Sequence, residues 1–391
     1  MNRKHKKLAF LMITLFMFSI VAGCGSKTAQ TPTATTIPVG LNLELSGGAA
    51  TYGADARDGA LLAIEQINAA GGLLGKQLEA IVKDNKSAAD EAMSVSSALV
   101  GAGVVAQIGP ATSGDVAGST PIVTEKKIPL ISPSATNEKV TIDDKTGAVR
   151  EYIFRVCFID PFQGTLMAQF AKSTLNAKNA VIIKDSSTDY AKGLADYFKK
   201  TFVAQGGTIL SEEGFVKDDR DFKAILTKVK GLNPDFIYVP GYYQEVAPLI
   251  KQARDLGITA TIGGGDGWVS DDLVKVAGAA NLNNTFFTTD FTAEDKDAKV
   301  VKFVADFQAK YNKVPNSFNA LGYDSVQMLA QAIKDAGAAD PVKIKDALAK
   351  IKDFVGVTGK ITIDANHNPI KAGIIIEYVN GKQVMKTRVQ P

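Results

Sequence analysis

Short apolar runs alternate with amphipathic helical patterns along most of this 391-residue chain, and that alternation limits the possible folds more than any other feature. Ala60, Ile64 and Ile67 recur at helical spacing before Gly71 and Gly72, which end the pattern. This order predicts an α/β fold with parallel sheets, helices on both faces, and ligands at the carboxyl ends of the strands. Strands are predicted at 39–45, 78–83, 104–108, 129–132, 180–184, 236–239 and 285–289.

The carboxyl-terminal region departs from the alternation. Residues 360–363 and 372–378 look like an antiparallel pair across a turn at 364–369, where Asn366, Asn368 and Pro369 supply turn chemistry. The chain, which is 46% apolar, is longer than one hydrophobic core usually supports. We therefore expect two lobes.

The amino terminus has the pattern of an export signal. Four basic residues precede an apolar stretch at 8–23, which is shorter than the roughly 20 apolar residues of a membrane-spanning helix. Cys24 follows Val-Ala-Gly, so this segment resembles the lipobox of bacterial lipoproteins; the alternative is an ordinary signal peptide with an incidental cysteine. Residues 27–38 have little to bury and predict a disordered tether. We expect a signal peptide at 1–23, a lipidated cysteine and tether at 24–38, and an extracytoplasmic protein anchored to the membrane only by lipid.

Composition excludes several functions. Removal of residues 1–23 leaves 40 basic and 41 acidic side chains, which argues against a nucleic-acid partner. The histidines are His5 in the signal and His367 in a predicted turn, and the usual nucleophile, phosphate-loop and metal motifs are missing. The glycine run at 263–265 fails the spacing of a dinucleotide turn. We expect no enzyme activity, no cofactor, no metal and, since a lipidated Cys24 leaves Cys157 without a partner, no disulfide.

A series of motifs resembles the branched-chain amino-acid binding proteins that serve ABC importers. The first is Tyr-Gly-Ala-Asp at 52–55, followed by Ile-Asn-Ala-Ala-Gly-Gly-Leu-Leu-Gly at 67–75. Others are Ile-Gly-Pro at 108–110, Ile-Ser-Pro-Ser-Ala-Thr-Asn at 131–137, Asp-Tyr-Ala-Lys-Gly-Leu at 189–194 and Gly-Tyr-Tyr at 241–243. Their order and spacing extend the resemblance from residue 38 to the end.

The resemblance implies a type I periplasmic-binding fold, in which two doubly wound parallel-sheet lobes are joined by three crossovers and enclose the ligand. We place the crossovers near Phe158, Phe287 and Gly356. The amino-terminal lobe would then comprise 37–158 and 288–356, and the carboxyl-terminal lobe 159–287 and 357–391.

The same resemblance assigns ligand contacts on the first lobe. Ser113 matches the serine that holds the ligand carboxylate, and Thr112 stands where some relatives carry cysteine. The start of a helix is a favourable place for an anion. Ala135 and Thr136 match a segment that offers a carbonyl to the ammonium and a hydroxyl and an N–H to the ligand backbone; simple helix capping is the alternative for Ser113 and Thr136.

Further contacts are implied around these. Ser134 offers a neighbouring carbonyl, and Tyr52 matches a wall of the side-chain pocket, although it could be an exposed loop tyrosine. On the second lobe the resemblance implies aromatic side chains that close over the ligand, a carboxylate for its ammonium, and the two residues after that carboxylate. These are Tyr190, Tyr242, Asp266, Gly267 and Trp268.

Asp266 stands where branched-chain binders often have glutamate, so the acid here is shorter, and Trp268 is expected to make the pocket wall bulkier.

The predicted function is capture of an amino acid, branched-chain or otherwise apolar, by closure of the lobes, with delivery to the permease subunits of an ABC importer by a monomeric protein. The alternatives are a ligand-sensing subunit of a receptor and a binding protein for another small amide, acid or aromatic metabolite.

The cysteine assignment can be tested directly. We expect Cys24→Ala to release the protein from the membrane or to leave its precursor uncut, because the variant cannot carry lipid. Each buried CH₂ of a lipid chain adds about 0.8 kcal/mol, so firm attachment needs more than one chain. Metabolic labelling with a fatty-acid analogue is the measurement, and a wild-type protein that takes up no label contradicts the assignment.

Overall fold

The computed structural model describes residues 36–390. The predicted signal peptide, Cys24 and most of the tether lie outside these residues. The tether prediction is wrong at its end, because Thr36, Ile37 and Pro38 already belong to strand β1 (Thr36–Leu43). Ile37 is buried in the core, and the Pro38 carbonyl accepts a hydrogen bond from the Val105 N–H at 2.9 Å. No helix within 36–390 is long and apolar enough to cross a membrane.

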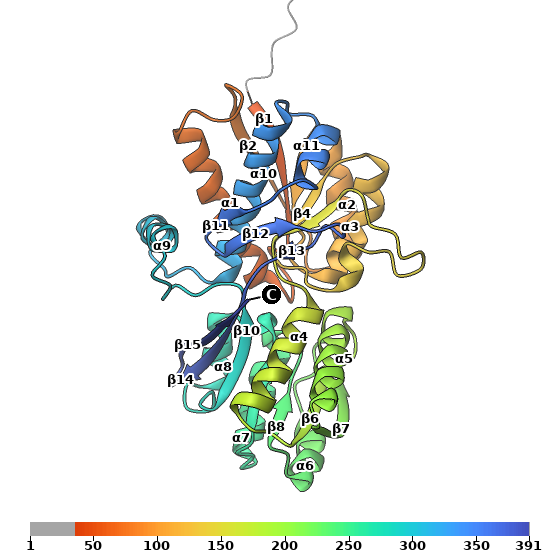
Figure 1. The fold of residues 1–391 in the computed structure, drawn as a ribbon, viewed down its shortest axis with the longest axis vertical. Coiled ribbons are helices and arrows are strands. Elements are labelled where there is room, and N and C mark those ends of the chain that lie inside the picture. Colours follow the sequence, from red (N-terminus) through yellow and green to blue (C-terminus); the bar gives the residue numbers. More distant parts are fainter. Residues whose placement is uncertain (1–35, 391) are drawn as a thin grey trace, which may run out of the picture. The chain divides into compact units, whose positions relative to one another are not determined.

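The first lobe, which contains the labelled strands β1, β2 and β4 in the upper part of Figure 1, is built on a five-stranded, wholly parallel sheet in the order β2-β1-β3-β4-β5. The strands after β1 are β2 (Gln77–Asp84), β3 (Ala106–Ile108), β4 (Leu130–Ser132) and β5 (Ile153–Arg155). Strands β3 and β4 are fully buried, as expected for a parallel sheet covered on both faces.

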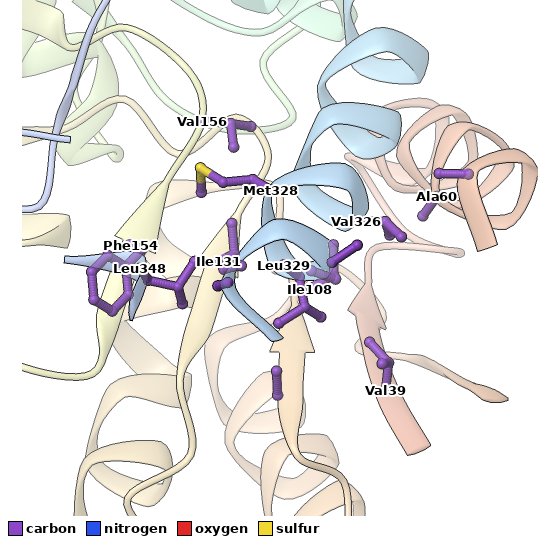
Figure 2. Close-up of a cluster of buried hydrophobic side chains, with 14 of the residues drawn as sticks. Val39, Ala60, Ile108, Ile131, Phe154, Val156, Val326, Met328, Leu329 and Leu348 are labelled. Atoms are coloured by element: carbon purple, nitrogen blue, oxygen red, sulfur yellow. The ribbon is translucent and has the colours of Figure 1, made fainter. Parts of the chain in front are cut away.

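Helices cover both faces of this sheet. Side chains of α1 (Ala50–Ala69), α10 (Ser317–Ala336) and α11 (Pro341–Leu348) share one core with β1, β3 and β4, and α2 (Ala89–Gly101) and α3 (Ser113–Glu125) pack into another. Figure 2 shows α10 side chains such as Met328 and Leu329 beside strand residues Ile108 and Ile131. Helix α9 (Ala298–Tyr311) lies outside these cores, in a smaller cluster with Phe303 and Phe307.

The second lobe has a seven-stranded sheet in the order β15-β14-β10-β9-β8-β6-β7. Five strands run parallel, and the last two join as antiparallel neighbours. The strands are β6 (Asn179–Asp185), β7 (Thr208–Phe215), β8 (Phe236–Tyr238), β9 (Thr261–Gly264), β10 (Thr285–Thr289), β14 (Gly373–Val379) and β15 (Lys382–Val389). The two predicted parallel sheets are therefore confirmed, although the sequence patterns missed β5, β7, β9 and β15.

Helices cover the second sheet in the same way. Side chains of α4 (Asp160–Gln169) and α5 (Asp189–Ala204) pack with one set of strand residues, and α6 (Lys223–Leu232), α7 (Tyr243–Asp255) and α8 (Asp271–Ala277) with another. The remaining helical segments are η1 (Glu138–Val140), η2 (Phe170–Thr174), which continues α4, and η3 (Asp266–Trp268).

The predicted carboxyl-terminal pair is wrong. Strand β12 (Gly359–Ile363) pairs with β11 (Phe354–Gly356) and β13 (Pro369–Ile370), whereas β14 pairs with β10 and β15. The β14–β15 hairpin turns instead at Asn380 and Gly381, which both have positive φ. Asn-Gly is the preferred dipeptide in two-residue hairpin turns, so this turn could have been predicted from the sequence.

The third crossover also lies later than expected. Ile361 and Ile363 on β12 belong to the first-lobe core, and Asn368 accepts hydrogen bonds from Thr141 Oγ1 and Arg155 Nε at 2.8 Å each. The chain enters the second sheet only at Gly373. The boundary placed at 356 is too early, because Ile361, Ile363 and Asn368 are buried against the first lobe.

One buried ion pair joins the three segments that connect the lobes. Lys371 Nζ lies 2.9 Å from Asp290 Oδ1 and donates to the Val156 carbonyl at 3.0 Å, while the Phe158 N–H donates to Asp290 Oδ1 at 3.2 Å. The Lys371 and Asp290 side chains are 0% and 1% exposed. Residues 156–158, 290 and 371 thus meet at one point, and Thr358 accepts a further hydrogen bond from Lys371.

This ion pair predicts a large stability effect. Lys371→Met leaves a buried carboxylate without its cation, and breaking such a pair costs about 3–5 kcal/mol. The double variant Lys371→Met/Asp290→Asn should lose less than the sum of the two single variants. Urea unfolding measures all three, and Lys386→Met, which removes an exposed pair with Glu377, is the matched control at under about 1 kcal/mol. Additive losses in the double variant would contradict the coupling.

Candidate functional site

Side chains from both lobes enclose a small cavity where the carboxyl ends of the two sheets face each other. Its volume is about 10 Å³, which is room for roughly one water molecule. It is lined by Tyr52, Ala111, Thr112, Ser113, Ser134, Tyr190, Tyr242, Asp266, Gly267 and Phe318. Eight of these ten are among the eleven ligand contacts implied by the sequence; Ala111 and Phe318 are additional.

The cavity adjoins a wider chamber of about 530 Å³ that shares Thr112, Ser113, Tyr190 and Tyr242 with it. Another hollow, of about 720 Å³, lies between α9, α10 and β11, and its lining shares no residue with the predicted site. Volume alone would therefore select a different place. The small cavity is distinguished by polar groups that converge on it while being almost wholly buried.

The first-lobe wall is the loop between β3 and α3 together with the loop after β4. Thr112 is the N-cap residue of α3, yet its side chain makes no capping hydrogen bond. Ser113 Oγ accepts from the Asn137 N–H at 3.3 Å, and Ser134 Oγ donates to the Ala111 carbonyl at 2.9 Å. The two serines thus tie the loops together, and the first turn of α3 faces the cavity.

The second-lobe wall is organised around Asp266, at the short η3 turn after β9. Its Oδ1 accepts hydrogen bonds from Tyr190 Oη at 2.8 Å and from Gln163 Nε2 at 3.1 Å. Tyr190 lies in the first turn of α5, and its hydroxyl also accepts from the Gly267 N–H at 2.9 Å. The Tyr190 and Tyr242 rings are stacked, with centroids 5.2 Å apart.

Tyr52 connects the two walls. It lies on α1 of the first lobe and is 2% exposed, so the alternative of an exposed loop tyrosine is wrong. Its hydroxyl donates to the Gly267 carbonyl at 2.5 Å and accepts from the Tyr243 N–H at 3.3 Å, both on the second lobe. Its ring stacks on Phe318 with centroids 4.4 Å apart. The structure therefore has the lobes in contact around the cavity.

Two carboxyl groups near the cavity have strongly raised pKa values. Burial raises the pKa of Asp160 to about 8 and the pKa of Asp266 to about 7, and the charge of Asp266 adds to the shift of Asp160. Gln163 Nε2 donates to Asp266 Oδ1 and, at 3.4 Å, to Asp160 Oδ1. Among the ion pairs formed by residues 36–390, none involves either aspartate. The site thus contains two buried acids and, among the described residues, no cation paired with either.

Three of the implied contacts lie outside the lining. The Trp268 indole is 0% exposed in the second-lobe core, where its Nε1 donates to the Val239 carbonyl at 3.0 Å. A Cβ on Gly264 would lie 2.1 Å from this indole, so that part of the glycine run serves close packing. Trp268 therefore does not make the pocket wall bulkier, and the expectation that it does is wrong.

Ala135 and Thr136 lie behind the lining. The Ala135 carbonyl accepts from Arg155 Nη1 at 2.8 Å, so this carbonyl is already engaged by a buried guanidinium. Thr136 Oγ1 is buried and has no hydrogen-bond partner among the described residues. Of the two, only Thr136 retains a free polar group for a ligand.

Several residues around the site were not predicted from the sequence. Asp160 and Gln163 lie one turn apart at the start of α4, directly after the first crossover, and Phe318 lies at the start of α10. Glu44, at the carboxyl end of β1, accepts hydrogen bonds from the Ala111 and Thr112 N–H groups. Each of these residues follows a strand or lies at the start of a helix. Such ends face the cleft, so these positions could have indicated a place near the site.

Comparison with known proteins agrees with this fold. The family described as periplasmic binding protein matches residues 36–383. A leucine-, isoleucine-, valine-, threonine- and alanine-binding protein of Pseudomonas aeruginosa is 31% identical over 350 residues, which is 90% of this chain and 91% of that protein.

Two solved structures are similar over 91% of the chain. The branched-chain amino acid transporter substrate binding protein LivJ from Streptococcus pneumoniae, in complex with isoleucine, is 43% identical with a TM-score of 0.85 and is covered completely. The leucine binding protein LivK from Thermotoga maritima is 34% identical with a TM-score of 0.85 and is covered to 99%. The chain therefore belongs to the periplasmic binding protein family that includes these branched-chain amino-acid binding proteins, as its motifs predict.

Proposed function

We propose that this protein is an extracytoplasmic lipoprotein that captures an aliphatic amino acid between its lobes and, as a monomer, delivers it to the permease subunits of an ABC importer. One observation carries the proposal: a small cavity between the lobes in which neutral donors from one lobe face the unpaired carboxyl group of Asp266 from the other. An amino acid carries the complementary pair of charges on adjacent atoms. The names of the related proteins, which bind leucine, isoleucine or valine, support this ligand class.

The two ends of the ligand would be bound by different lobes. Its carboxylate would meet the first turn of α3 and the hydroxyls of Thr112 and Ser113, where free N–H groups favour an anion. Its ammonium would meet Asp266, which Gln163 links to Asp160. A buried charge is tolerated when it is paired and hydrogen-bonded, so the ammonium would supply the cation that the chain does not.

The remaining walls favour an apolar ligand side chain. Tyr52, Tyr242 and Phe318 present aromatic surface, and no Arg or Lys lines the small cavity. A second carboxylate or a phosphate on the ligand would ordinarily call for such a cation. The same lining contains no group arranged for covalent chemistry, which supports binding without turnover.

Binding would be coupled to movement of the lobes. A cavity of about 10 Å³ does not hold an amino acid, so the walls must separate for it to enter. The Tyr52 to Gly267 hydrogen bond is one contact that would break. Because the three connections meet at Lys371 and Asp290, rotation about that point would open the cleft while each lobe moves as a rigid body.

A thermal-shift screen of the common amino acids tests the proposal. Leucine, isoleucine or valine should raise the melting temperature most, because a ligand present at 100 times its Kd stabilises by about 2.7 kcal/mol. Stabilisation only by sugars, amides or aromatic acids would overturn the ligand class. Leucine uptake by cells that lack the gene separates transport from a sensing role.

Asp266 should recognise the ammonium group. We expect Asp266→Asn to weaken binding of the best amino acid by about 2–5 kcal/mol, because the substitution keeps the shape and removes the partner charge. Titration calorimetry measures this. Asp272→Asn, an exposed aspartate paired with Lys275, is the matched control and should bind as the wild type does. Equal affinity of Asp266→Asn and wild type, or tighter binding of leucine's analogue without an amino group, would contradict the assignment.

The buried Asp160 should make the ligand-free protein less stable as pH rises. An unfolded aspartate titrates near pH 4, while burial holds the pKa of Asp160 at about 8. Between these values the folded protein retains a proton that the unfolded chain has released, so the free energy of unfolding falls with rising pH.

Asp160→Asn removes this contribution. The free energy of unfolding of wild type minus that of the variant should fall by about 2 kcal/mol or more between about pH 5 and about pH 8. Urea unfolding gives the difference. Asp189→Asn is the control, since ion pairing with Lys139 lowers the pKa of Asp189 and its difference should stay flat over this window. A flat difference for Asp160→Asn would show that this group is ionised throughout.

A further inference from the structure

A buried asparagine of the first lobe makes hydrogen bonds to the second lobe beside the cavity. Asn137 lies in the loop after β4 and is 6% exposed. Its Nδ2 donates to the Asp189 carbonyl, at the start of α5, at 2.8 Å, and to Asp160 Oδ2, at the start of α4, at 3.0 Å. Both hydrogen atoms of this amide are therefore used between the lobes.

The rest of Asn137 is held inside the first lobe. Its Oδ1 accepts from the Lys139 N–H at 3.0 Å and so caps η1, and its carbonyl accepts from Arg155 Nη1 at 2.8 Å. Its own N–H donates to Ser113 Oγ, the hydroxyl expected to meet the ligand's carboxylate, at 3.3 Å. An amide side chain has one acceptor oxygen and one NH₂ donor, so only this orientation satisfies all its partners. Asn137 thus joins Ser113 directly to the helix that carries Tyr190.

Helix α5 has a glycine at the point where this amide arrives. A Cβ on Gly193 would lie 2.8 Å from Asn137 Nδ2 and 2.7 Å from Asp160 Oδ2, both closer than van der Waals contact. Glycine inside a helix is less favourable than alanine. Here the missing side chain leaves room for a group that comes from the other lobe.

The next two residues of η1 also contact α5, but closer to the surface. Tyr197 Oη donates to Glu138 Oε2 at 2.6 Å, and Lys139 Nζ lies 3.0 Å from Asp189 Oδ2. The Lys139 and Asp189 side chains are 50% and 49% exposed, and exposed ion pairs contribute little. The Asn137 amide should contribute more, because its partners are buried and its loss would leave them without a donor.

We propose that Asn137 is a positioning residue for ligand capture: its amide binds α5 when the lobes are together, holds Ser113 opposite Asp266, and so slows release of the bound amino acid. The inference rests on the proposed function, since the ligand must occupy this cavity. For the ligand to leave, the lobes must separate, and the hydrogen bond from Asn137 to the Asp189 carbonyl must then break.

Asn137→Ser tests the role of the amide. Serine keeps an oxygen that can cap η1 but has no NH₂ that can reach α5. Titration calorimetry with L-leucine should show binding weakened about tenfold or more. Stopped-flow fluorescence should assign the loss mainly to faster dissociation, with the association rate within about threefold of wild type. Asn366→Ser, at an exposed turn of the first lobe, is the matched control and should bind as wild type does.

Gly193→Ala gives a result that general damage to the fold would not give. In wild type its methyl group would displace the Asn137 amide, so L-leucine should bind about tenfold more weakly. In Asn137→Ser, which lacks the amide, the same change should cost less than about threefold more. Asp160 is present in both backgrounds, so the difference between them reports the contact with Asn137. Gly231→Ala in α6 is the control, since a Cβ there finds no atom of the described residues within 4 Å.

A measurement without ligand distinguishes failure of this inference from failure of the proposed function. Asn137→Cys/Gly193→Cys should form an intramolecular disulfide under mild oxidation, because side chains at these positions lie next to each other across the lobes. Neither single variant should form one, since Cys157 is buried. Intact mass after thiol labelling counts the free cysteines.

The outcomes separate as follows. If no amino acid binds the wild type, the proposed function fails, and the role of Asn137 in retention fails with it even if the disulfide forms. If leucine binds the wild type but the disulfide does not form, the inference alone is overturned. The same holds if Asn137→Ser keeps wild-type affinity, or if the losses from Asn137→Ser and Gly193→Ala simply multiply.

Discussion

The buried ion pair between Lys371 and Asp290 is the contact on which the arrangement of the lobes depends. It joins the first connection, through Val156 and Phe158, to the second and the third. Two charges inside a protein are costly unless they are well paired and hydrogen-bonded, so these segments are held in one geometry. The pair thereby fixes the three connections at one point, about which the proposed rotation of the lobes would occur. Asp290 Oδ2 has no partner among the described residues, so this carboxylate depends on Lys371 all the more.

The cleft beyond this junction has an uneven distribution of charge. The first-lobe wall offers hydroxyl groups and a helix start, and its acid, Glu44, is turned away from the cavity towards the Ala111 and Thr112 amides. The second-lobe wall presents Asp266 directly to the cavity. Two buried acids with raised pKa values, Glu44 and Asp266, thus lie on opposite sides of the cavity, and burial is the main cause of both shifts.

Motif order and spacing predicted much of the site, yet the outcome differed from residue to residue. Ser113, Tyr190 and Asp266 follow or begin regular elements whose ends face the cleft, so a match by position also places their side chains there. Trp268 is two residues from Asp266, but η3 turns its indole into the core. Sequence proximity to a binding residue does not determine side-chain direction in a one-turn helix.

The sequence by itself determined the parallel sheets, most of their strands, the family and most of the cavity lining, since these depend on local apolar periodicity and on motifs that lie within single loops. Only the tertiary structure decided the path of the carboxyl-terminal region, where β12 and β14 have similar strand patterns but pair in different lobes. It alone also brought Glu44 under the α3 loop and Lys371 beside Asp290. Such contacts join residues tens of positions apart, and their energies arise from burial and charge pairing that no local pattern contains.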